Sequence, residues 1–322
     1  MDNPMSQRPD SDSKEWKLIE KALLASQSEQ RTARRWGIFF KFLTFFYLFG
    51  IFMVIRAPMG GETMSVTAEP HAAVVEVSGP IAADQPASAD NIVGAMRRAF
   101  ENEQALGLIL RINSPGGSPV QSGYVYDEIQ RLKETRPDFP VYAVIMDIGA
   151  SGAYYIAAAA DEIYADKASL VGSIGVVGSG FGFVEAMEKL GVERRLYTSG
   201  EHKAFLDPFS PQNEDEKTFW KSVLNVTHQQ FIAQVQAGRG ERLADEPDLF
   251  SGLVWTGEQA LELGLVDGLS SSSRLARDVL GTEELVSYTR KPDPFLELME
   301  RFGASVGSGL ASSVTSQFMT LR

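Results

Sequence analysis

The chain combines one long apolar segment near its start with a later alternation of strand-like and helix-like patterns. The segment WGIFFKFLTFFYLFGIFMVI fills residues 36–55 and carries a single charge, Lys41. Twenty helical residues span about 30 Å, the thickness of a bilayer's hydrocarbon core. Arg31, Arg34 and Arg35 precede the segment, and basic flanks stay on the cytoplasmic side. The pattern predicts one transmembrane anchor with a cytoplasmic N-terminus.

A cleaved signal peptide is the alternative interpretation of this segment. Signal peptides have apolar regions of about 7–15 residues after a short basic start, whereas 35 residues precede this one. The Lys41 side chain lies near the cytoplasmic end and can extend to the headgroups. We therefore predict an anchor at 36–55, a largely disordered cytoplasmic tail at 1–35 and a linker at 56–70.

Downstream of the linker, apolar runs alternate with segments of helical spacing. The expected strands are 71–79, 105–112, 141–148 and 162–166. The expected helices are 91–103, 118–135, 151–160, 214–237 and 255–269, the last closed by glycines. Such alternation predicts an α/β domain over 71–291, with a parallel sheet covered on both faces. Residues 292–322 are expected to form a helical and flexible tail.

Composition then excludes several kinds of site. The net charge of −12 and the lack of a basic stripe argue against a nucleic-acid partner. Because the chain has no cysteine, disulfides, a thiol nucleophile and thiolate zinc sites are excluded. The three histidines, His71, His202 and His228, are too scattered to suggest a metal site. We expect neither a metal nor a cofactor.

Glycine-rich turns follow three of the expected strands, at the edge where open α/β sheets bind ligands. In RINSPGGSP (111–119), Gly116 and Gly117 allow backbone conformations that point amides into a cleft and suit an oxyanion. The alternative is an ordinary strand-to-helix turn. The turn at 171–180 contains Ser173.

Ser151 stands in the remaining turn, where a strand ends and a helix begins. Its hydroxyl is a candidate nucleophile, and the alternative role is a helix N-cap, which serine favours. Nothing in the spacing places His202 or His228 near it as a base. Lysine serves as a base when burial lowers its pKa, although a lone lysine such as Lys203 is usually a solvated charge.

One further serine matches a catalytic pattern by letters alone. GASVG (303–307) fits G-x-S-x-G around Ser305. A nucleophile elbow needs a strand before the serine and a helix after it. Ser305 follows a polar, helix-like stretch, so we set it aside.

Taken together, the motifs between about residues 70 and 290 resemble the signal peptide peptidase A family, in its short bacterial form. The resemblance rests on five segments in order: RINSPGG (111–117), ASGAYYIA (150–157), SLVGSIGVV (169–177), SGEHKAFLDPFSP (199–211) and WTGEQALELGLVDGL (255–269). It implies a ClpP/crotonase-like core. It also implies that Ser151 is the nucleophile, Lys203 the general base and Ser173 the residue that orients the lysine. The implied oxyanion hole consists of the amides of Gly116, Gly117 and Gly152.

The resemblance further implies a membrane-anchored serine endopeptidase that degrades cleaved signal peptides and other apolar peptides. It suggests a homo-oligomeric ring in which neighbouring subunits share sites. With the predicted anchor, it places a single-pass protein in the inner membrane, its catalytic domain periplasmic or otherwise extracytoplasmic. Two alternatives remain: a crotonase-like acyl-CoA enzyme, and a non-catalytic membrane scaffold with the same fold.

Overall fold

The structure, a computed structural model, divides the chain into two compact units, Met1–Ser65 and Val66–Arg322. It describes residues 21, 24 and 34–52 of the first unit and residues 69–290 of the second. Most of the predicted tail at 1–35, residues 56–68 of the predicted linker, the tail at 292–322 and Ser305 lie outside the described residues.

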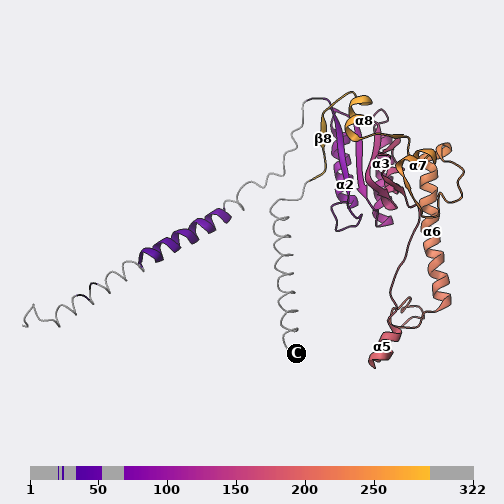
Figure 1. The fold of residues 1–322 in the computed structure, drawn as a ribbon, viewed down its shortest axis with the longest axis horizontal. Coiled ribbons are helices and arrows are strands. Elements are labelled where there is room, and N and C mark those ends of the chain that lie inside the picture. The colour runs from indigo at the N-terminus through magenta and orange to yellow at the C-terminus, as the bar shows by residue number, and fades with distance from the viewer. Residues whose placement is uncertain (1–20, 22–23, 25–33, 53–68, 291–322) are drawn as a thin grey trace, which may run out of the picture. The chain divides into compact units, whose positions relative to one another are not determined.

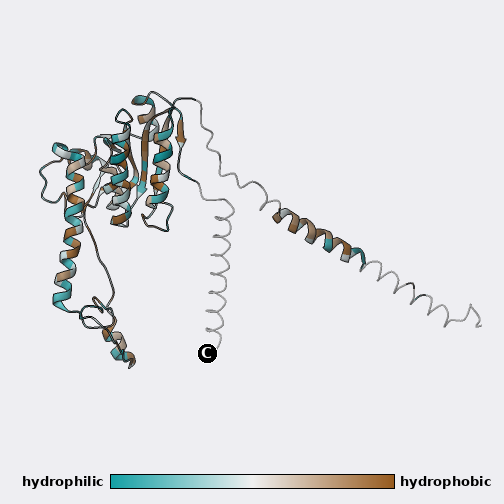
Figure 2. Ribbon diagram, turned by 180° about the vertical axis from the view of Figure 1, so that it is seen from behind, coloured by the Kyte–Doolittle hydropathy of each residue, from teal (hydrophilic) through white to brown (hydrophobic). Residues whose placement is uncertain are grey.

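The first unit contains the predicted apolar helix, described over Arg34–Phe52. Its mean hydropathy is 1.3, none of its apolar window is buried, and it is long enough to cross a membrane. Figure 2 shows hydrophobic residues along its length. By length and composition this helix is a candidate membrane span, and residues 53–55 of the predicted anchor lie outside the described part.

The second unit is built on an eight-stranded sheet. Its strands are β1 (His71–Ser78), β2 (Ala105–Ser114), β3 (Val141–Ala150), β4 (Glu162–Ala165), β5 (Leu170–Gly172), β6 (Val254–Thr256), β7 (Gly268–Leu269) and β8 (Leu285–Ser287). The strand order is β6-β5-β3-β2-β1-β8, and β4 pairs with β3 and β7. Among the described pairs, only β5 and β6 are antiparallel. The mostly parallel α/β sheet predicted from the sequence is confirmed.

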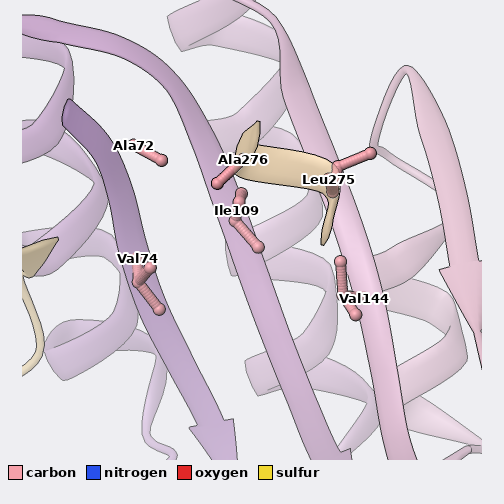
Figure 3. Close-up of a cluster of buried hydrophobic side chains, with 6 residues drawn as sticks. All are labelled: Ala72, Val74, Ile109, Val144, Leu275 and Ala276. Atoms are coloured by element: carbon pink, nitrogen blue, oxygen red, sulfur yellow. The ribbon is translucent and has the colours of Figure 1, made fainter. Parts of the chain in front are cut away.

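Helices cover the sheet on both faces, though unequally. Right-handed crossovers that step from β1 to β2 to β3 keep their connecting helices on one face. That face carries α2 (Ala89–Glu101), α3 (Pro119–Thr135) and α4 (Gly152–Ala157), as Figure 1 shows for α2 and α3. The other face is covered by α8 (Ser272–Asp278), whose Leu275 and Ala276 join a buried cluster on β1, β2 and β3 (Figure 3).

Strand β3 changes partners near its end, and this change precedes the candidate site. Its residues 142–145 pair with β4, whereas residues 148–150 pair with β5. Against β2, the register passes from Ile112–Ile145 to Ser114–Gly149, so β3 carries two extra residues. The buried Ser169 hydroxyl donates to the Ile145 carbonyl at 3.3 Å beside this irregularity. The end of β3 therefore leads into a separate small part of the sheet, β5 and β6.

A long helix, α6 (Glu214–Arg239), packs on this core through its C-terminal half. There Phe231 packs on Tyr155 with ring centroids 5.1 Å apart, and the buried Arg239 forms two hydrogen bonds to Asp267, of 2.6 and 2.9 Å. The other end of α6 extends past the sheet towards α5 (Val184–Leu190), which buries no residue (Figure 1). We call residues 177–226 the arm.

Two predicted helices are shorter than expected. Residues 255–269 do not form one helix: α7 spans only Gly257–Glu262, between β6 and β7. Thr256 starts α7 through a reciprocal capping box with Gln259, which leaves Trp255 to pair with Val171 on β5. Gly264, at φ 71°, follows its end. The helix predicted at 151–160 ends at Ala157.

Candidate active site

Ser151 occupies a strained position between β3 and α4. Its backbone has φ 53° and ψ −126°, a conformation that residues with a Cβ rarely adopt. Its amide donates to the Gly172 carbonyl at 2.8 Å, which holds the turn against β5. The hydroxyl makes no capping hydrogen bond to α4. Serine at this helix start is therefore not acting as an N-cap, and its hydroxyl is available for chemistry.

Gly116 packs directly against Ser151. A Cβ added at Gly116 would lie 2.8 Å from the Ser151 Cβ and 2.7 Å from the Gly152 nitrogen. The residue also has φ 93°, which glycine adopts without steric cost. Only glycine fits here, so the turn after β2 and the turn after β3 meet at this point.

Gly117 and Gly152 bring two backbone amides side by side. A Cβ on Gly152 would lie 3.3 Å from the Gly117 nitrogen and 2.4 Å from the Ser122 hydroxyl oxygen. Gly117 in turn is held by Ile81: the Ile81 amide donates to Gly116 at 2.9 Å, and Ser118 donates to Ile81 at 2.8 Å. The Gly117 turn is thus fixed by backbone hydrogen bonds to Ile81, close to Gly152.

The three predicted oxyanion-hole amides differ in whether they already donate a hydrogen bond within the chain. The Gly116 amide donates to the Ser114 hydroxyl at 3.1 Å. The amides of Gly117 and Gly152 donate to no other group in the described part of the chain. Gly152 is buried and Gly117 is exposed, and two free amides beside an uncapped hydroxyl suit a ligand oxygen. Gly116 contributes close packing, and Gly117 and Gly152 present the donors.

Ser173 lies one residue beyond the carbonyl that binds Ser151. Its backbone is also strained, with φ 50°, and its amide donates to Leu253 at 2.7 Å. The next carbonyl, of Ile174, is within 3.1 Å of the His228 Nε2 on α6. The structure thus places both serines on adjoining segments and ties Ser173 to α6.

Lys203 is not brought to the serines within one chain. It is exposed, in the turn formed by residues 201–206 of the arm. Among the described residues, no hydrogen bond or ion pair joins Lys203 to Ser151 or Ser173. The predicted site is therefore assembled in two parts, with the serines and glycines on the sheet and the lysine on the arm.

Several residues around the site had no signal in the sequence. The buried Ser122 donates to the Ser118 carbonyl at 3.1 Å and contacts Gly152, and His228 binds the Ser173 segment. Burial raises the pKa of the Tyr154 hydroxyl far above its usual value, and this hydroxyl donates to Leu265 at 2.6 Å. Tyr154 is therefore a structural donor. The described residues contain no group of three or more His, Asp or Glu side chains placed to hold a metal.

Known proteins are similar to parts of this chain. The family model described as Peptidase family S49 matches residues 133–284. A putative protease of Synechocystis, slr0021, is 33% identical over 197 residues, which cover 61% of this chain and 69% of that protein. A putative signal peptide peptidase SppA of Enterococcus faecium is 32% identical over 182 residues, 56% of this chain and 52% of that protein.

Two Brucella relatives carry a different name. A Brucella abortus protein named Na(+)/H(+) antiporter NhaA is 45% identical over 188 residues, which cover 58% of this chain and 25% of that protein. The chain thus spans a quarter of the Brucella protein and about half of the Enterococcus protein.

Proposed function

The chain belongs to peptidase family S49, and from this premise we propose that it is a membrane-anchored serine endopeptidase with a Ser151/Lys203 dyad. Its mostly parallel sheet with flanking helices is the ClpP/crotonase-like fold of that family. The observation that carries the proposal is the strained Ser151, whose uncapped hydroxyl stands beside the free amides of Gly117 and Gly152.

In the proposed reaction, the Ser151 hydroxyl attacks a peptide carbonyl while the Lys203 amine accepts its proton. The amides of Gly117 and Gly152 then bind the oxyanion, each contributing roughly 3–4 kcal/mol to transition-state stabilisation. The protonated lysine gives its proton to the leaving amine, which forms an acyl-enzyme on Ser151. Water, deprotonated by the same lysine, releases the acid and restores the serine. Ser173 orients the lysine amine in this scheme.

A neighbouring copy of the chain supplies Lys203 in this proposal. The support is twofold: among the described residues no hydrogen bond or ion pair joins Lys203 to the serines of its own chain, and the arm exposes large apolar side chains. Val177 is 86% exposed, Phe181 82% and Tyr197 89%. Apolar surface of this extent in one segment marks an interaction site. A homo-oligomeric ring would cover the arm and complete each site from two subunits.

The proposed substrates are apolar peptides, chiefly remnant signal peptides, at a membrane surface. The name of the Enterococcus relative, putative signal peptide peptidase SppA, supports this substrate class, and the helix Arg34–Phe52 supports the location. Arg31, Arg34 and Arg35 favour a cytoplasmic N-terminus, which would put the catalytic domain on the opposite side of the inner membrane.

The test uses the full chain, solubilised in detergent, with a fluorophosphonate probe and an apolar fluorogenic peptide. We expect the probe to label Ser151, and both Ser151→Ala and Lys203→Ala to lower kcat/KM by at least about 10³-fold. Two controls are matched: Ser305→Ala for the serine, and Lys189→Ala, an exposed lysine of the same arm. Full activity of the Lys203→Ala protein would exclude the dyad, and turnover of an acyl-CoA thioester without Ser151 would favour the acyl-CoA alternative.

A further inference from the structure

Three described non-glycine residues have a positive φ, and two of them are the proposed site serines. Ser151 has φ 53° and Ser173 has φ 50°. The third is Leu206, at φ 54°, three residues after Lys203. Side chains with a Cβ disfavour this conformation, and it persists only where surrounding contacts impose it. The strained backbone at Leu206 therefore points to a constraint on the turn that carries Lys203.

That constraint comes from the first turn of α6. The Leu206 amide donates to the Glu216 carboxylate oxygen Oε2 at 3.2 Å, and both residues are half-buried. Next to them, the Phe205 ring meets the edges of Phe219 and Trp220, with centroids 5.7 and 6.1 Å apart. The turn is thus attached to α6 by one charge-assisted hydrogen bond and two aromatic contacts.

Within the turn, local hydrogen bonds make residues 200–207 a coherent unit. The Lys203 amide donates to Gly200 at 3.2 Å, and Asp207 donates to Ala204 at 3.1 Å. Beyond it, Asp207 accepts from Ser210 at 2.6 Å and pairs with Arg194. With both flanks tied down, rotation about φ of Leu206 is the motion that would swing Lys203 relative to α6.

We propose that Glu216 is a positioning residue for Lys203, which it orients by holding Leu206 in the left-handed conformation. The inference rests on the proposed dyad and extends it. Lysine carries its charge on a flexible four-carbon side chain. A lysine base on the arm therefore needs a fixed backbone position if its amine is to reach the serine reproducibly. Because the other end of α6 is anchored on the core through Phe231 and Arg239, the helix connects the backbone of the Lys203 turn to the core.

The experiment compares variants of the full, solubilised oligomer by kcat, KM, rate of Ser151 labelling and Tm. Glu216→Ala removes the acceptor, and we expect kcat and the labelling rate to fall together, by up to about 100-fold, at nearly unchanged KM and Tm. Glu216→Gln keeps an oxygen acceptor in place and should restore most of kcat. Leu206→Gly in the Glu216→Ala background should raise kcat again, because glycine adopts a φ of 54° without strain.

Glu214→Ala is the matched control. It removes a carboxylate from the same helical turn that pairs only with Lys217 among the described residues, at 3.3 Å, and it should keep wild-type kcat. Equal losses in the Glu214 and Glu216 variants, or wild-type kcat in Glu216→Ala, would overturn the positioning role. Lys203→Ala, measured in parallel, distinguishes a failure of the proposed Ser151/Lys203 dyad from a failure of the positioning role of Glu216. If it remains active, the dyad itself is wrong; if it is inactive while Glu216→Ala is fully active, only the present inference fails.

Discussion

At the scale of single residues, two serines at the starts of neighbouring helices have opposite roles because their backbones differ. Ser118 precedes α3 with φ −61° and ψ 122°, and its hydroxyl accepts from the Gln121 amide at 3.4 Å. This is the extended conformation from which a side chain can cap. Ser151 precedes α4 with a positive φ and caps nothing. Serine favours N-cap positions in general, and backbone conformation decides which of these two serines is available as a nucleophile.

The same scale gives a steric prediction at Gly152. A methyl group there would lie 2.4 Å from the Ser122 hydroxyl oxygen and would push the Gly152 amide away from that of Gly117. We expect Gly152→Ala to lower kcat by about 10²–10³-fold, the usual effect of losing one oxyanion donor, and to destabilise the fold by about 1–3 kcal/mol. Peptide hydrolysis and thermal unfolding measure the two effects.

Gly123→Ala is the control for this substitution. A Cβ at Gly123 meets nothing within 4 Å, and alanine in the middle of α3 should stabilise the helix by about 0.5–1 kcal/mol without loss of activity. Ser122→Ala, combined with Gly152→Ala, should recover part of the lost stability by removing the oxygen. A fully active Gly152→Ala enzyme would contradict the role assigned to this amide.

At the scale of elements, one carboxylate links the two helices that cover the sheet beside the site. Glu128 on α3 accepts from Arg131 on the same helix at 2.7 and 2.9 Å, and from Arg97 on α2 at 2.7 Å. The hydrogen bonds from Arg131, and then those from Arg97, lower the pKa of Glu128 to about 2. The Glu128 side chain is largely buried, whereas both arginines are half exposed.

The lowered pKa of Glu128 determines how the stability of the fold changes with pH. A carboxylate whose pKa is lowered on folding adds stability above its unfolded pKa, near 4.3, and loses it as the pH falls towards 2. Between pH 6 and 2, we expect the free energy of unfolding of the wild type to fall by about 1–2 kcal/mol more than that of Glu128→Gln. This figure is reduced to allow for the solvent exposure of the two arginines.

Thermal unfolding across this pH range tests the Glu128 prediction. Glu134→Gln, which changes an exposed glutamate of the same helix without a described ion pair, should follow the wild-type curve. If Tm falls with pH equally in the wild type and in Glu128→Gln, the Glu128 link between α2 and α3 does not stabilise the fold.

At the scale of the whole molecule, the proposed site is complete only if copies combine. The sheet presents Ser151 and the two free amides, the arm presents Lys203, and the arm's apolar side chains are exposed in one chain. A closed ring would bury those side chains and pair the arm of one subunit with the sheet of the next. This arrangement leads to a complementation test.

Two inactive variants should restore each other when they share an oligomer. In a random one-to-one mixture of Ser151→Ala and Lys203→Ala chains, roughly a quarter of the shared sites receive both wild-type residues. Co-expression with two different tags, purification through both, and peptide hydrolysis measure the recovered activity. A mixture of Ser151→Ala with the doubly substituted chain should stay inactive. No recovery in the first mixture would place Ser151 and Lys203 of each site on one chain.

The sequence by itself determined the features that depend on local pattern. Apolar runs such as 105–112 and 141–148 predicted buried parallel strands, helical spacing predicted α2, α3 and α6, and the long apolar segment predicted the helix described over Arg34–Phe52. Turn chemistry placed Ser151 between a strand and a helix. These features are set by neighbouring residues, so one chain segment is enough to specify them.

Tertiary structure alone decided the rest, because it depends on residues far apart in sequence. Trp255 forms a strand rather than a helix since Val171 offers it a pairing partner, and Ser151 is strained because Gly172 binds its amide. Ser114 accepts from the Gly116 amide and so leaves only the Gly117 and Gly152 amides free. Glu216 accepts from the Leu206 amide and so fixes the backbone of the Lys203 turn. Residue types suggested the chemistry of the site, and long-range hydrogen bonds determined its geometry.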